Sequence, residues 1–100
     1  MRIINTHRIL YVEDEPEVAE LFRASVGSQG HAVDLAATGA AALEMYSAEA
    51  YDLVAVDFQL PDMSGLDVAE RLLADDPDLP IVMVTGKGSE KVAARALSLG

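Results

Sequence analysis

The sequence predicts an α/β fold, a doubly wound parallel sheet with helices on both faces. Short apolar runs at 9–12, 53–56 and 81–84 stop abruptly at polar or turn residues, which is typical of fully buried parallel strands. Stretches with a helical spacing of apolar residues separate the strands throughout, and such alternation favours a parallel sheet. The 100 residues contain no repeat or linker, so we expect one domain over 1–100, with residues 1–7 as a leader.

The first half of the chain is predicted to form two strands and two helices. Residues 8–12 form the first strand. Pro16 suits the first turn of the helix that follows, and Gly27 and Gly30 are expected to end this helix. Residues 31–36 alternate in polarity enough to predict a less buried edge strand, and 38–48 form the second helix. The apolar positions expected on the inner faces of these two helices are Val18, Leu21, Phe22, Val26, Ala42, Leu43 and Tyr46.

The second half repeats this pattern around the central strand, 53–56. A loop leads from this strand to Gly65, and Ser64 is expected to cap a third helix. Residues 75–80, rich in Asp and Pro, are expected to form a solvated connection to the strand at 81–84. The inward positions expected in the third helix, and in a last helix capped by Ser89, are Leu66, Ala69, Leu72, Leu73, Val92, Ala96 and Leu97.

The composition restricts the partners of the chain. The formal net charge is −10, which argues against nucleic acid or an anionic membrane, since both are bound through basic clusters. Cysteine is absent, so the sequence offers no disulfide and no thiolate metal site. No apolar run reaches the roughly 18 residues of a membrane span, and the start of the chain lacks the apolar core of a signal peptide. We therefore expect a soluble, cytoplasmic protein.

Polar side chains follow three of the predicted strands where each one ends. Asp57 comes directly after the central strand, Glu13 and Asp14 follow the first, and Thr85 follows the last. The carboxyl ends of parallel strands meet at one edge of a sheet, and open α/β sheets bind ligands at that edge. We therefore expect three carboxylates and a hydroxyl to converge there.

This predicted convergence indicates a site for a metal ion and a phosphoryl group. Carboxylates this close repel one another unless a cation lies between them, and all-oxygen ligands suit Mg²⁺. Asp57 would then act as a nucleophile toward phosphorus, and Thr85 would donate its hydroxyl to a phosphoryl oxygen. Simpler interpretations stay open at this point: Glu13 and Asp14 as caps of the first helix, Thr85 as a cap of the last, and Lys87 as a solvated loop charge.

Three motifs resemble those of the receiver domains of two-component response regulators. They are Ile-Leu-Tyr-Val-Glu-Asp-Glu at 9–15, Val-Asp-Phe-Gln-Leu-Pro-Asp-Met-Ser-Gly at 56–65, and Ile-Val-Met-Val-Thr-Gly at 81–86. The resemblance runs from about Arg8 to the end of the chain. It implies a flavodoxin-like sheet with strand order 2-1-3-4-5, the fifth strand and fifth helix being absent from this sequence. It also implies a signalling module that catalyses only its own phosphorylation and dephosphorylation, not a turnover enzyme.

The resemblance assigns roles to individual residues. Asp57 would be the phosphoacceptor and Thr85 the switch hydroxyl that follows the phosphoryl group. Gln59 and Lys87 would stand where the family tunes the lifetime of the phosphate. The Mg²⁺ ligands that the resemblance implies are Asp14, Asp57, the backbone carbonyl of Gln59 and, through water, Glu13.

The resemblance also implies partners, and the sequence departs from it at one end. The phosphoryl donor would be a sensor histidine kinase or a histidine phosphotransfer protein, and a downstream effector domain or protein would read a face around 86–100. A receiver of this kind would continue past Gly100 into a fifth strand, a Lys-Pro turn and a fifth helix, so we expect a truncated chain. Without a fifth strand, the run 81–84 would be an exposed apolar edge, open to dimerisation or strand swapping.

Three other functions stay open. The missing lysine suggests a truncated receiver that binds partners without phosphorylation. A magnesium phosphohydrolase with an aspartate nucleophile would need a second acid two residues after Asp57, where Gln59 stands. A flavin-binding protein of the same topology is disfavoured, because the acidic first loop would repel a phosphate unless a metal intervened.

Overall fold

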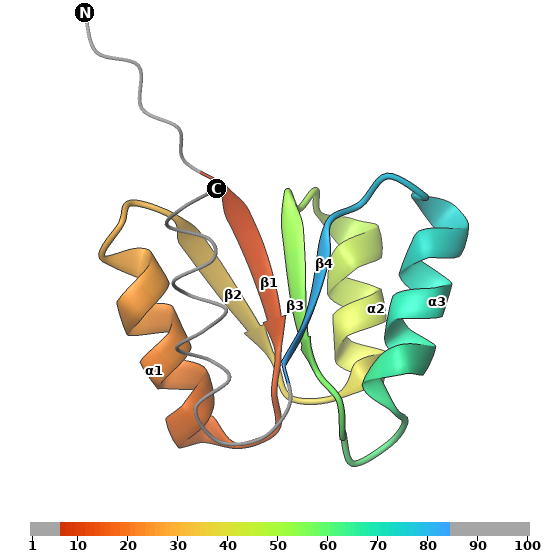
Figure 1. The fold of residues 1–100 in the computed structure, drawn as a ribbon, viewed down its shortest axis with the longest axis horizontal. Helices are drawn as coiled ribbons and strands as arrows, with labels where there is room; N and C mark the ends of the chain where they lie inside the picture. The colour runs from red at the N-terminus through yellow and green to blue at the C-terminus, as the bar shows by residue number, and fades with distance from the viewer. Residues whose placement is uncertain (1–6, 85–100) are drawn as a thin grey trace, which may run out of the picture.

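The computed structural model describes residues 7–84, which form one parallel sheet with helices on both faces (Figure 1). The elements in chain order are β1 (Arg8–Val12), α1 (Pro16–Gly27), β2 (Ala32–Ala36), α2 (Gly39–Ala48), β3 (Leu53–Asp57), α3 (Gly65–Asp75) and β4 (Ile81–Val84). The strand order is β2-β1-β3-β4, which confirms the predicted α/β class and this part of the predicted order. The leader up to residue 6 and the helix expected after Ser89 lie outside the described residues.

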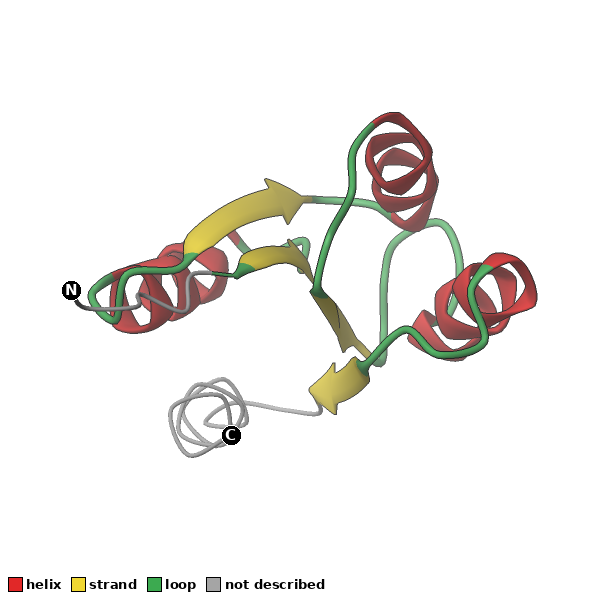
Figure 2. Cartoon of the chain, turned by 90° about the horizontal axis from the view of Figure 1, so that it is seen from above, coloured by secondary structure: helices red, strands yellow, loops and turns green. Residues whose placement is uncertain are grey.

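The helices lie on opposite faces of the sheet, α1 on one face and α2 and α3 on the other (Figure 2). The side chains of β1 point alternately to the two faces of the sheet. Leu10 and Val12 pack in the core with α2 and α3, whereas Ile9 and Tyr11 pack in the core with α1. This burial on both faces explains why the strand is continuously apolar instead of alternating. Within residues 7–84, no helix has the length and apolar character needed to cross a membrane.

Three leucines expected on the inner faces of helices lie at the surface instead. Leu21 of α1 is 57% exposed, and Leu66 and Leu73 of α3 are 48% and 38% exposed. The buried side chains are those of Ala19, Phe22 and Val26 in α1, and of Val68, Ala69 and Leu72 in α3, where Gly65 is buried as well. One residue turns a helix by about 100°, so a side chain next to a narrow buried stripe already faces solvent. The prediction was wrong for these leucines because it took each apolar stripe to be wider than the sheet covers.

The connection between α3 and β4, expected to be solvated throughout, contains a core residue. Leu79 is 6% exposed and belongs to the core beneath α2 and α3. Its N–H donates to the carbonyl of Asp76 (3.1 Å), whose carboxylate accepts a hydrogen bond from the Tyr46 hydroxyl of α2 (3.0 Å). The prediction was wrong for Leu79 because a single apolar residue among Asp and Pro neighbours gives no periodic pattern.

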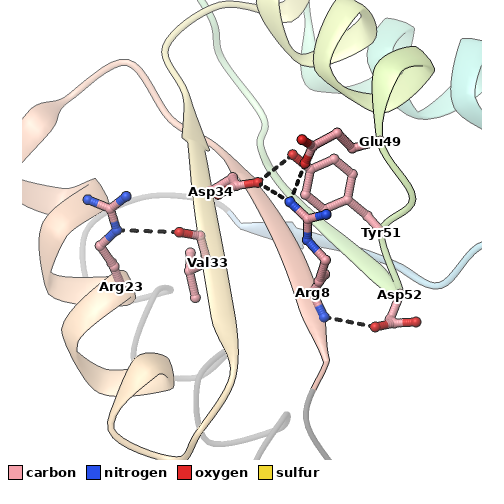
Figure 3. Close-up of polar contacts among 7 residues, drawn as sticks. All are labelled: Arg8, Arg23, Val33, Asp34, Glu49, Tyr51 and Asp52. Atoms are coloured by element: carbon pink, nitrogen blue, oxygen red, sulfur yellow. Dashed lines mark hydrogen bonds and ion pairs between the residues drawn. The ribbon is translucent and has the colours of Figure 1, made fainter.

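Arg8 joins several elements at the edge of the sheet where the strands begin. Its guanidinium contacts Asp34 of β2 (3.1 Å) and Glu49 after α2, and lies 5.3 Å from the ring centroid of Tyr51 (Figure 3). The Tyr51 hydroxyl donates to the same Asp34 carboxylate (2.6 Å), and the Arg8 N–H donates to Asp52 (2.8 Å). This cluster ties β1 and β2 to the α2–β3 connection, at the edge opposite the carboxyl ends of the strands.

Candidate metal centre

The register of the sheet brings the ends of β1 and β3 side by side. Val12 pairs with Val56, so the next residues, Glu13 and Asp57, are neighbours at the carboxyl edge of the sheet, the lower edge in Figure 1. One carboxylate oxygen from each of Glu13, Asp14 and Asp57 lies within 4.8 Å of the others. Within residues 7–84, these three side chains, called the acidic cluster below, are the group close enough together to hold a metal ion.

Glu13 is the most enclosed member of the acidic cluster, with 7% of its surface exposed. Its backbone N–H donates to the carbonyl of Ala36 at the end of β2 (2.9 Å). Its Oε1 accepts a hydrogen bond from the Tyr11 hydroxyl (3.2 Å), and its Oε2 accepts one from the backbone N–H of Glu15 (3.1 Å). Since Glu15 occupies the N-cap position of α1, Glu13 also fixes the chain where this helix begins.

Burial is the main cause of the raised pKa values in the acidic cluster. It raises the pKa of Glu13 to about 7, and the charge of Asp57 adds to this rise while hydrogen bonds from Glu15 and Tyr11 oppose it. Burial also raises the pKa of Asp57, as does the charge of Asp14, against hydrogen bonds from the backbone of the following loop. A cation among these oxygens would relieve the repulsion, and a donor set made of oxygens alone fits Mg²⁺.

The raised pKa of Glu13 predicts that the metal-free chain loses stability as the pH rises. This carboxyl ionises near pH 4.5 in the absence of structure and has a pKa of about 7 in the folded chain. A group whose pKa is raised by folding stabilises the folded state below the unfolded value, and this contribution is lost as the pH passes the folded value. In EDTA, we expect the free energy of unfolding to fall by about 1 to 2 kcal/mol between about pH 5 and pH 8, after allowance for solvent near the site.

Urea unfolding across this pH range is the measurement that checks the prediction. Glu13→Gln is the matched variant, because its amide keeps the size of the side chain and has no proton to lose. The pH dependence of its free energy of unfolding should be flatter between pH 5 and pH 8 than that of the parent chain. An equally steep fall in Glu13→Gln would show that some other group causes it.

The loop between β3 and α3, residues 58–64, is closed on itself. The Gly65 N–H donates to the carbonyl of Phe58 (2.8 Å), and Gln59 and Ser64 form an isolated antiparallel bridge. The Ser64 hydroxyl caps α3, as the sequence predicts. These contacts hold the end of β3, and with it Asp57, close to the start of α3.

Asp62, a residue that sequence reasoning missed, ties this loop to α2. Its two carboxylate oxygens accept hydrogen bonds from the N–H groups of Gly39 and Ala40, each at 2.9 Å. These hydrogen bonds lower the pKa of Asp62. The first turn of α2 contains no acidic residue, so Asp62 supplies the negative charge that a helix N-terminus favours. The sequence does contain a signal for this contact. The first turn of α2 has no acidic residue, and the loop after β3, at the same edge of the sheet, has an aspartate that could supply the missing charge.

Of the other predicted site residues, Gln59 lies within the part of the chain that the structure describes, and Thr85 and Lys87 lie beyond it. Gln59 is exposed, two residues after Asp57, and the role of its carbonyl as a metal ligand stays a prediction. Val84, the residue before Thr85, pairs with Asp57 across β3 and β4. Thr85 and Lys87 themselves lie outside the described residues, so their roles also stay predictions.

Comparison with known proteins points to one family. The family model of the response regulator receiver domain matches residues 9–100. Curated relatives include the transcriptional regulatory protein DltR of Streptococcus agalactiae, 39% identical over 93 residues, and the probable transcriptional regulatory protein TcrX of Mycobacterium tuberculosis, 34% identical over 92 residues. The matches cover 93% and 92% of this chain but 42% and 39% of the two relatives, so the chain spans about two fifths of their length.

Solved structures with the same fold include a receiver domain and a response regulator protein. The non-phosphorylated HemR receiver domain from Leptospira biflexa has a TM-score of 0.75 and 33% identity, over 93% of this chain and 75% of that one. The response regulator TrrA from Thermotoga maritima, crystallised in complex with Mg²⁺-BeF, has a TM-score of 0.77 and 34% identity, over 85% and 74%. A crystal structure of the histidine kinase ThkA in complex with TrrA matches with a TM-score of 0.74 and 33% identity, over 84% and 78%.

Proposed function

This chain belongs to the response regulator receiver domains, and on that basis we propose that Asp57 accepts a phosphoryl group from a histidine of a sensor kinase or phosphotransfer protein. A receiver domain is a signalling module of a two-component system and not a classical enzyme. The observation that carries the proposal is the acidic cluster, which brings Asp57 together with Glu13 and Asp14 at the carboxyl edge of the sheet.

In the proposed transfer, a carboxylate oxygen of Asp57 attacks phosphorus in line with its bond to the donor. The new P–O bond forms as the P–N bond of the donor phosphohistidine breaks, and the imidazole nitrogen takes the electron pair. When bound, Mg²⁺ would neutralise the charge that gathers on the phosphoryl oxygens. The residues that would hold it are Asp14, Asp57, the backbone carbonyl of Gln59 and, through water, Glu13.

Two solved structures of one relative, TrrA, support the cofactor and the donor in this proposal. TrrA, 34% identical to this chain, was crystallised in complex with Mg²⁺-BeF, and TrrA was also crystallised in complex with the histidine kinase ThkA. The oxygen donors of the acidic cluster suit the same cation here. We therefore propose Mg²⁺ as the cofactor of this chain and a histidine kinase or phosphotransfer protein as its partner, in the cytoplasm.

The output of the switch is a further part of the proposal. DltR and TcrX are transcriptional regulatory proteins, and this chain spans about two fifths of their length. We propose that an effector domain or protein reads the phosphorylated state through the face around residues 86–100. Thr85 would follow the phosphoryl group as the switch hydroxyl, and Gln59 and Lys87 would tune its lifetime.

Intact-mass measurement of the chain tests the proposed function. After incubation with acetyl phosphate and Mg²⁺, the chain is expected to gain the mass of one phosphoryl group. Replacing Mg²⁺ with EDTA should remove this gain, because the charges of the acidic cluster would then repel the incoming phosphate. An unchanged mass with Mg²⁺ present would contradict the phosphoacceptor role, and equal uptake in EDTA would contradict the role of the metal.

A further inference from the structure

We propose that Tyr11 is a positioning residue of the metal centre, its hydroxyl holding the Glu13 carboxylate in the orientation that serves the bound cation. The inference rests on the proposed function, because it concerns the same acidic cluster. Tyr11 is not proposed as a ligand of the cation. Its hydroxyl acts on the site through Glu13, and this distinguishes it from the residues that would bind Mg²⁺.

The geometry of β1 places the two side chains on the same side of the sheet. Tyr11 and Glu13 are two positions apart, and side chains at this spacing share a face. The Tyr11 hydroxyl lies 3.2 Å from Oε1 of Glu13, and the backbone N–H of Glu15 lies 3.1 Å from Oε2. Each oxygen of the carboxylate is therefore held by a separate donor, one on the strand before it and one on the chain after it.

A glutamate needs such support more than an aspartate at the same position would. It has one more rotatable bond, so more conformational freedom is lost when its carboxylate is held at one place. The hydrogen bonds from Tyr11 and Glu15 fix the carboxylate before any cation arrives. Pre-orientation of this kind, by groups behind the ligands, is a common means by which proteins strengthen metal sites.

The ring of Tyr11 is itself immobilised by α1. Tyr11 and Phe22 are both fully buried, and their ring centroids lie 4.2 Å apart with 34° between the planes. A phenylalanine at position 11 would keep this ring contact and would bring no polar atom into the core. The hydroxyl is thus the part of Tyr11 that packing does not require, and the acidic cluster accepts its hydrogen bond.

Calorimetric titration of the chain with Mg²⁺ tests the inference without any phosphodonor. Tyr11→Phe, which removes the hydroxyl and keeps the ring, is expected to raise the Kd for Mg²⁺ about tenfold. Tyr46→Phe is the matched control, because it removes a hydroxyl of α2 that donates to Asp76, the residue after α3, away from the acidic cluster. Its Kd should equal that of the parent chain. An unchanged Kd in Tyr11→Phe would overturn the inference.

A double-mutant cycle with Glu13→Asp separates positioning from a general effect on the fold. The shorter carboxylate no longer reaches the Tyr11 hydroxyl, so adding Tyr11→Phe to Glu13→Asp should leave the Kd unchanged. An equal loss of Mg²⁺ affinity on adding Tyr11→Phe to the parent chain and to Glu13→Asp would overturn the inference. A loss of stability caused by Tyr11→Phe itself would lower the affinity equally in the two comparisons. If the parent chain itself binds no Mg²⁺, the metal-dependent function fails, and the positioning role with it. If the parent chain binds Mg²⁺ and Tyr11→Phe binds it with the same Kd, the positioning role is refuted and the proposed function is not.

Discussion

Asp57→Asn is expected to abolish phosphoryl uptake from acetyl phosphate while leaving the fold intact. The amide has the shape of the carboxylate but lacks its nucleophilic oxygen and its negative charge, so it can neither attack phosphorus nor contribute a charge to the metal site. Burial raises the pKa of Asp57, which means that the folded chain disfavours its ionised form. The variant should therefore unfold in EDTA at a urea concentration at or above that of the parent chain.

Asp75→Asn is the matched control for this substitution. Asp75 is exposed at the last residue of α3, at the end of that helix remote from the acidic cluster. Asp75→Asn also replaces a carboxylate with an amide but leaves the acidic cluster unchanged. The mass that this variant gains in the presence of Mg²⁺ should equal the mass gained by the parent chain. Phosphoryl uptake by Asp57→Asn, or its loss in Asp75→Asn, would contradict the assignment of the phosphoacceptor.

Gly65→Ala is expected to lower the free energy of unfolding by about 2 to 3 kcal/mol, which is the usual cost of forcing extra atoms into a packed site. A Cβ atom at this position would lie 2.2 Å from the backbone carbonyl oxygen of Asp57 and 3.0 Å from Cγ1 of Val56. The carbonyl belongs to the last residue of β3, so it cannot move without shifting Asp57. We therefore expect weaker Mg²⁺ binding together with the loss of stability.

The control for this prediction is Gly27→Ala in α1, where nothing lies within 4 Å of the added Cβ. Alanine is a better helix former than glycine, so this variant should be more stable than the parent chain by up to about 1 kcal/mol. Urea unfolding of both variants gives the comparison. If Gly65→Ala were as stable as Gly27→Ala, the close packing of α3 against the end of β3 would be disproved.

The position of the acidic cluster could be predicted from the sequence because it depends on local signals. Each strand is a short apolar run with a clear end, and parallel strands place these ends at one edge. The sequence alone therefore predicts that Glu13, Asp14 and Asp57 lie at this edge, and the structure confirms that the three are close together. The strand order, in contrast, came from the resemblance of the motifs, since hydrophobic pattern alone does not say which strands pair.

Two kinds of contact could not be predicted from the sequence: contacts between residues far apart in the chain, and a hydrogen bond made by a residue that also packs in the core. Asp62 meets the start of α2, more than 20 positions earlier, and Arg8 meets Glu49 across a larger separation. Neither contact leaves a periodic signal. Tyr11 was indistinguishable from its apolar neighbours in β1, because a buried aromatic residue in a strand gives the same pattern whether or not its hydroxyl has a role.

Locating the phosphoryl group within the chain is the most direct test of the central claim, that Asp57 is the phosphoacceptor. Borohydride reduction of an aspartyl phosphate gives homoserine, so tandem mass spectrometry of the reduced, digested chain shows which residue carried the group. We predict homoserine at position 57 when the chain has been treated with acetyl phosphate and Mg²⁺, and none after treatment in EDTA. Homoserine at another aspartate, with Asp57 unmodified, would contradict the claim.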